Sequence, residues 1–121
     1  MHARFIAAAL MLSVGTVSVM AAGTVLSPAQ IKTLFGTGKP FTAVPRSGGK
    51  AYWFTFKPDG SALEVPKGTN QTGATGTWDL SAKGYCSKWG GSRAHCYTVA
   101  KNGDQYEVRD RVGYLVSRWT P

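Results

Sequence analysis

The chain has 121 residues and a formal net charge of +8, from 14 lysines and arginines against 6 aspartates and glutamates. This length allows one domain and excludes large two-domain enzymes. Hydrophobic residues make up 43% of the chain and charged residues 17%, which indicates a folded protein rather than a disordered one. The 15 glycines and the 12% of aromatic residues favour a turn-rich β protein over a helix bundle.

Residues 1–22 have the layout of a secretory signal peptide. A short basic start from Met1 to Arg4 precedes an apolar stretch from Phe5 to Val19, and small residues follow. The apolar stretch is shorter than the roughly 20 residues that span a bilayer. We therefore expect export to the periplasm, or else secretion, with cleavage near residues 21 to 23 and no stable membrane insertion afterwards.

One short helix is predicted at about residues 27 to 35. Ser27 is a suitable N-cap, Pro28 suits the first helical position, and Gln30 completes a capping box. The apolar face of this helix would consist of Ile31, Leu34 and Phe35. A helix of two to three turns is marginal on its own, so we expect it to cover one end or edge of a sheet.

After Gly38 the pattern changes to short β segments separated by turns. About seven strands are expected, over residues 51–57, 61–65, 75–80, 85–89, 94–100, 105–110 and 114–119. This regular spacing is typical of an antiparallel meander that forms a small barrel or sandwich, lipocalin-like in layout. The predicted fold is therefore mainly β, with one short N-terminal helix, in a single domain over residues 23–121.

The hairpin between the predicted strands 94–100 and 105–110 has a turn signal at Asn102-Gly103, because both residues tolerate the positive φ of a type I′ turn. A two-residue loop there pairs Val99 with Tyr106 and His95 with Asp110. The side chains on the core face would be Tyr97, Val99, Tyr106 and Val108.

Cys86 and Cys96 are the two cysteines of the chain, and in an exported protein they predict a disulfide. Such a bond stabilises a fold by roughly 2–3 kcal/mol for a loop of this size. Redox pairs are usually closer in sequence. A zinc site needs about four ligands. Removal of the predicted signal peptide takes His2 with it, so only His95 is available beside the two thiols, and neither a metal nor a cofactor is expected.

The predicted registers align Ser87, His95 and Asp110 across three strands. A carboxylate beside an imidazole orients the ring and raises its pKa, so a hydrolytic triad is one interpretation. The sequence contains no nucleophile elbow and no evident oxyanion site. We favour a polar cross-strand cluster at the barrel rim and expect no enzymatic activity.

Aromatic and basic residues supply the candidate contacts for a ligand or partner. In the segment 52–56, alternation places Trp53 on the face opposite its aromatic neighbours. The basic residues are spread along the chain, which suits a solubility surface or attraction to anionic envelope polymers. Nucleic acid would fit the charge and the aromatics, but the expected export argues against it. The candidate contact residues are Trp53, Trp89, Arg93, Arg109 and Arg111.

The order of these features is similar to that of small exported bacterial all-β proteins that are treated as domains of unknown function. The resemblance rests on Gly76-Thr77-Trp78, on Cys86 and Cys96 flanking a hairpin, and on Asn102-Gly103-Asp104 in place of an Asp-Gly turn. It covers most of the mature chain and implies structural motifs, with no catalytic residues to carry over.

These observations lead us to expect an exported, non-catalytic β module that binds an envelope protein or a small or polymeric anionic ligand. One alternative is an inhibitor of a protease or lysozyme, or an envelope-stress protein, acting through an exposed loop at 67–74 or 89–93. The other is the hydrolase that uses Ser87, His95 and Asp110.

Overall fold

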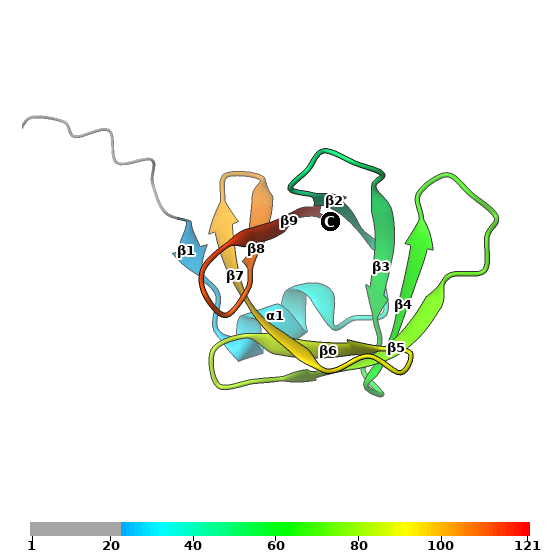
Figure 1. The fold of residues 1–121 in the computed structure, drawn as a ribbon. Coiled ribbons are helices and arrows are strands. Elements are labelled where there is room, and N and C mark those ends of the chain that lie inside the picture. The colour runs from blue at the N-terminus through cyan, green and yellow to red at the C-terminus, as the bar shows by residue number, and fades with distance from the viewer. Residues whose placement is uncertain (1–22) are drawn as a thin grey trace, which may run out of the picture.

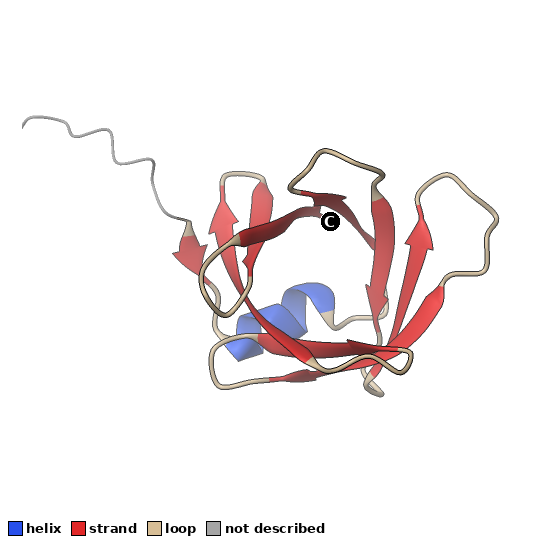
Figure 2. Cartoon of the chain, in the orientation of Figure 1, coloured by secondary structure: helices blue, strands red, loops and turns tan. Residues whose placement is uncertain are grey.

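A computed structural model describes residues 23–121, and the predicted signal peptide at residues 1–22 lies outside this described part. The described residues form an eight-stranded closed antiparallel barrel in meander order, with one short helix near the N-terminus (Figures 1 and 2). The helix is α1 (Pro28–Phe35), and the strands are β1 (Thr24–Val25), β2 (Phe41–Pro45), β3 (Tyr52–Phe56), β4 (Ser61–Pro66), β5 (Ala74–Leu80), β6 (Tyr85–Trp89), β7 (His95–Asn102), β8 (Gln105–Arg109) and β9 (Leu115–Thr120).

The barrel closes because β2 pairs with β9 as well as with β3. Each strand from β2 to β9 pairs with the next one along the chain. The seven predicted strands correspond to β3 through β9, so the mainly β prediction is confirmed and the barrel alternative is the one that forms. The strand β2, which completes the ring, was not predicted, because a proline ends it and prolines usually interrupt strands.

The short strand β1 lies outside the ring and extends its sheet. Along one and the same edge, β7 pairs with β6 at residues 95–97 and with β1 at Ala100 and Lys101. The Leu26 N–H donates to the carbonyl oxygen of Val99 at 2.8 Å. A Cβ at Gly23 would lie 2.5 Å from the carbonyl oxygen of Lys101. The first described residues are therefore part of the sheet.

The predicted capping box begins α1. The Gln30 N–H donates to Ser27 Oγ at 3.2 Å, and the Ser27 N–H donates to Gln30 Oε1 at 2.8 Å. Ile31 and Phe35 are buried, whereas Leu34, expected on the same face, is 45% exposed. Because eight residues make little more than two turns, two buried side chains are enough to dock the helix.

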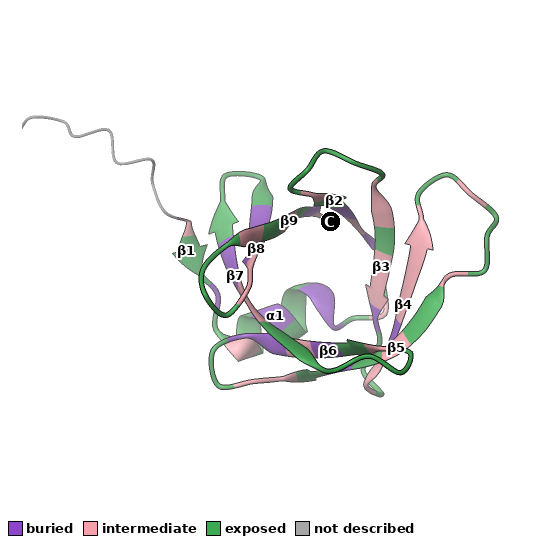
Figure 3. Ribbon diagram, in the orientation of Figure 1, coloured by how far each residue is buried: buried purple, intermediate pink, exposed green. Residues whose placement is uncertain are grey.

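The helix places the ring of Phe35 among the aromatic side chains inside the barrel. Its ring centroid lies 4.9 Å from that of Phe41, 4.8 Å from that of Tyr106 and 4.9 Å from that of Trp119. Phe56 contacts Trp119 and is also buried. These rings are buried and fill the barrel where α1 packs against it. Figure 3 colours the buried parts of α1 and of the strands purple.

The predicted register of the β7–β8 hairpin is wrong by two residues. Val99 pairs with Val108 and Asn102 pairs with Gln105, so the two-residue loop is Gly103-Asp104. Every described residue with a positive φ is a glycine, and Gly103 has φ +61°. A glycine at the first loop position is the pattern of a type II′ turn rather than type I′. Because a shift of two residues keeps each side chain on its face, the core assignment is unchanged.

This shift removes the predicted pairing of His95 with Asp110. Strand β8 ends at Arg109, which pairs with Thr98, and Asp110 lies in the following loop. The register on the other side of β7 is confirmed, with Ser87 opposite His95.

The predicted disulfide is confirmed. Cys86 and Cys96 are bonded and occupy directly opposite positions of β6 and β7. Tyr85 pairs with Tyr97 as predicted, and their ring centroids lie 5.3 Å apart.

Candidate functional site

A cleft of about 550 Å³ lies where β7 and β8 part. The two strands pair from Asn102 back to Thr98, and beyond that point β8 gives way to the loop 110–114. One wall of the cleft is the start of β7 with the residues before it, and the other wall is the 110–114 loop. The lining residues are Arg93, Ala94, His95, Cys96, Tyr97, Asp110, Arg111, Val112 and Val116.

Asp110 gives the 110–114 loop its shape. Its Oδ1 accepts hydrogen bonds from the N–H groups of Val112 and Tyr114, both at 3.0 Å. Its own N–H donates to the carbonyl oxygen of Tyr114 at 2.9 Å, and Gly113 N–H donates to the Asp110 carbonyl at 3.1 Å. An aspartate that accepts from nearby backbone N–H groups is a common turn former. Asp110 therefore has a structural task in the cleft wall.

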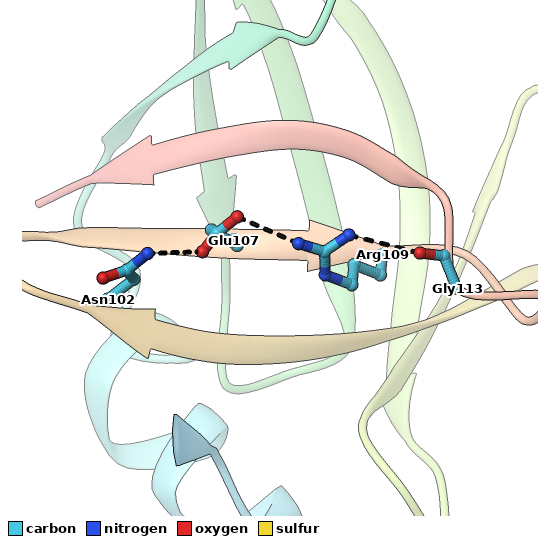
Figure 4. Close-up of polar contacts among 4 residues, drawn as sticks. All are labelled: Asn102, Glu107, Arg109 and Gly113. Carbon is cyan, nitrogen blue, oxygen red and sulfur yellow. Dashed lines mark hydrogen bonds and ion pairs between the residues drawn. The ribbon is translucent and has the colours of Figure 1, made fainter. Parts of the chain in front are cut away.

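A line of polar contacts ties the same loop to the barrel (Figure 4). The Arg109 guanidinium donates to the carbonyl oxygen of Gly113 at 3.2 Å and forms an ion pair with Glu107 at 3.1 Å. The other Glu107 oxygen accepts from Asn102 Nδ2 at 2.8 Å. Glu107 is buried, and a buried carboxylate needs such partners. Arg109 thus anchors the loop and is not among the residues that line the cleft.

An extra residue in β9 supplies an apolar patch to the cleft. Val108 pairs with Ser117 and Arg109 pairs with Leu115, so Val116 is bulged. Bulges redirect side chains and are frequent beside functional sites. Val116 lines the cleft together with Val112, which is 72% exposed. Part of the wall is therefore apolar and open to solvent.

Three residues with basic side chains line this cleft. Arg93 comes from the loop before β7, His95 begins that strand, and Arg111 comes from the 110–114 loop. A second hollow of about 280 Å³ shares Cys96 and Arg111 with the cleft and is also lined by Lys83. Asp110 is the acidic residue among those that line either hollow, and it already accepts two backbone hydrogen bonds. The charge around the cleft is therefore mainly positive.

Tyr97 lies on the inner side of the cleft. Burial raises the pKa of its phenol, and the negative charge of Asp110 raises the pKa further. The hydroxyl is consequently protonated at neutral pH and can donate a hydrogen bond.

The structure brings together four of the residues predicted as site residues, namely Arg93, His95, Asp110 and Arg111. Ser87 pairs with His95 in the β6–β7 ladder but is only 5% exposed, and within residues 23–121 no side-chain hydrogen bond joins Ser87, His95 and Asp110.

The two candidate tryptophans lie away from the cleft lining. Trp89 packs against the core, with its ring centroid 5.6 Å from that of Phe54, and its ring covers Gly76. Trp53 is 37% exposed on the opposite face of β3. This placement agrees with the prediction that alternating side chains put Trp53 and Phe54 on opposite faces of β3.

The sequence reasoning misses Ala94, Tyr97, Val112 and Val116 among the cleft residues. Tyr97 was assigned only to the core, and Val112 and Val116 carry no sequence signal, because a bulge and a parting of strands depend on long-range pairing.

Two further properties concern the described residues 23–121. They contain no group of three or more His, Cys, Asp and Glu side chains arranged to bind a metal ion. Their single helix is too short to cross a membrane.

Comparison with protein-family models, with curated proteins and with solved structures finds no match to this chain. The resemblance inferred from Gly76-Thr77-Trp78 and the paired cysteines stays a prediction.

Proposed function

We propose that this protein is an exported, non-catalytic β-barrel module that binds an anionic ligand in the cleft between β7 and the 110–114 loop. The support comes chiefly from Arg93 and Arg111. They are far apart in the sequence, yet the fold places both at one cleft.

The geometry suits recognition of negative charge. Arginine guanidinium groups bind carboxylates and phosphates through several N–H donors at once. His95 and the protonated Tyr97 hydroxyl add donors to the same cleft. The net charge of +8 also favours the approach of an anion from solution.

The elements that carry the cleft residues are also held firmly in place, as in a binding site on a rigid scaffold. The Asp110 turn and the Arg109 contact hold the 110–114 loop, and the disulfide ties Cys96 on β7 to β6. Side chains on held elements lose less conformational entropy when a ligand binds.

Isothermal titration with inorganic tripolyphosphate tests this proposal. We expect saturable binding to the wild-type protein that weakens about tenfold or more in the double variant Arg93→Ala/Arg111→Ala. The double variant Lys32→Ala/Lys39→Ala removes the same charge from exposed positions in and just after α1 and should bind nearly as well as wild type. Equal losses in the two variants would mean that the anion senses net charge alone, and the cleft proposal would then fail.

A further inference from the structure

The cleft exposes a free edge of β7 as well as charged side chains. The carbonyl oxygen of Val99 accepts from Leu26, so Val99 directs its backbone groups toward β1. The carbonyl oxygen of Tyr97 lies against Gly84, just before β6, and therefore points to the same side. Because backbone groups alternate along a strand, Cys96 directs its N–H and C=O the other way, toward the cleft.

The spacing of the two cysteines agrees with this orientation. The Cα atoms of Cys86 and Cys96 lie 3.9 Å apart. In antiparallel pairs, the shorter spacing belongs to positions that do not exchange backbone hydrogen bonds with each other. The ladder to β8 begins only at Thr98, so within residues 23–121 no strand pairs with Cys96 on the cleft side.

The loop that could cover this edge is held in place by other contacts. The carbonyl oxygen of Gly113 accepts from Arg109 (Figure 4). The N–H groups of Val112 and Tyr114 donate to Asp110. These backbone groups are therefore engaged within the β8–β9 hairpin. Cys96 is exposed and lines both hollows, so its backbone remains open to a partner.

We propose that an extended acidic peptide segment of a partner protein adds as a strand along the cleft edge of β7 at Ala94 to Cys96. This inference rests on the proposed function, since it uses the same cleft, and it specifies the ligand. Exposed strand edges bind peptides through main-chain hydrogen bonds, while pockets beside the edge select side chains.

The side chains around this edge determine which peptide fits. Arg93, Arg111 and Lys83 favour carboxylates on one part of the peptide. Val112 and Val116 present an apolar surface in the same cleft. Since side chains alternate along a strand, a segment that alternates acidic and apolar residues satisfies both surfaces.

Three peptides of the same length test the proposal on the unaltered protein. The parent is a fluorescein-labelled hexapeptide of alternating glutamate and valine. The other two peptides are N-methylated forms of it and isomers of each other, with the methyl groups either on the glutamate amides or on the valine amides. A paired strand uses one edge only, so we expect one isomer to bind about tenfold more weakly than the parent and the other to bind nearly as well. Fluorescence anisotropy measures the affinities, and amide hydrogen exchange should show protection of the Cys96 N–H in the complex.

The outcomes separate this inference from the proposed function. If both isomers bind as tightly as the parent, strand addition is overturned, while binding of tripolyphosphate would leave the anion site standing. If a glutamine–valine hexapeptide binds as tightly as the parent, the preference for acidic peptides is overturned. If tripolyphosphate does not bind but one isomer alone loses affinity, strand addition holds and the general anion site fails.

Discussion

The indole ring of Trp78 lies against the backbone of Gly36, so closely that a Cβ at residue 36 would be 2.7 Å from Cη2. Gly36 has φ −79°, a value open to any residue, so the ring rather than the backbone conformation requires glycine. Trp78 cannot easily move aside, because its Nε1 donates to the carbonyl oxygen of Lys57 at 2.8 Å. The contact joins the end of α1 to β5.

Replacing Gly36 by alanine should therefore destabilise the fold. We expect the free energy of unfolding in urea to fall by about 1–3 kcal/mol, the usual cost of overpacking. The control is Gly91→Ala, because a Cβ there meets no atom within 4 Å, and its effect should stay within about 0.5 kcal/mol. A Gly36→Ala variant as stable as Gly91→Ala would contradict the contact.

Removing the disulfide should lower stability while leaving the fold intact. The double variant Cys86→Ser/Cys96→Ser loses a cross-link between β6 and β7, so its free energy of unfolding should fall by roughly 2–3 kcal/mol. Urea unfolding of the oxidised wild type, the reduced wild type and the variant measures the loss. Two titratable thiols in denatured, unreduced protein would show that the bond does not form.

The ion pair between Glu107 and Arg109 gives a third prediction. Arg109→Ala leaves the buried Glu107 without its cation and releases Gly113. Since the Arg109 side chain is itself 42% exposed, we expect only about 1 kcal/mol of lost stability. The loop should loosen more than the barrel, which faster exchange of the Val112 amide would reveal.

A double-mutant cycle isolates this pair. In Glu107→Gln/Arg109→Ala, no unpaired charge remains, so the loss should be smaller than the sum of the two single losses. Additive losses would mean that the two side chains act independently.

Glu64 should make stability depend on pH. It pairs with Phe54 across β3 and β4, so both side chains share one face, and burial raises the pKa of Glu64 above its usual value of 4.5. A raised pKa in the folded state means that the neutral carboxyl is favoured by folding. The stability it contributes is full below pH 4.5, where the unfolded chain is also protonated, and is lost as the pH rises through the folded-state pKa.

Glu64→Gln should consequently be more stable than wild type at pH 7 and nearly equal to it below pH 4. Urea unfolding across this range, with Asp104→Asn in the exposed β7–β8 turn as control, measures the difference. A constant difference at all pH values would show that the carboxyl does not respond to its burial.

The strand β1 predicts the start of the mature protein. Gly23 packs against the carbonyl oxygen of Lys101, and Thr24 pairs with Lys101. Of the two cleavage positions that the predicted signal peptide allows, after Ala21 or after Gly23, we expect the first, because the second would remove Gly23, which lies against Lys101 next to β1. Intact mass measurement of exported protein distinguishes them, and a mature N-terminus at Thr24 would disprove the expectation.

Local patterns in the sequence predicted the parts of the fold that depend on neighbouring residues. Ser27 and Gln30 form the capping box because the motif is complete within four residues. The strands β3 to β9 were recognisable because aromatic and branched residues alternate between clear turns. The disulfide followed from two cysteines in a chain expected to be exported.

The remaining features depend on contacts between distant segments. Asn102 and Gly103 both suit a hairpin loop, and the neighbouring Asp104 suits one equally, so local preference could not choose between loops one residue apart. The cleft arises from the end of pairing at Thr98 and from the bulge at Val116. Neither is visible before the strands are assembled, although Arg93, His95 and Arg111 were already candidates.

The rings of Phe35, Phe41, Phe56 and Trp119 fill the barrel interior near α1, so this half of the molecule is solid instead of cup-shaped. The length and the charge of a loop can then change without disturbing these packed rings. Variation of residues 91–94 and 111–112, which keeps Asp110 and Gly113 in place, should therefore still yield folded proteins. In this respect the barrel offers a small, disulfide-stabilised framework that can carry new loop sequences.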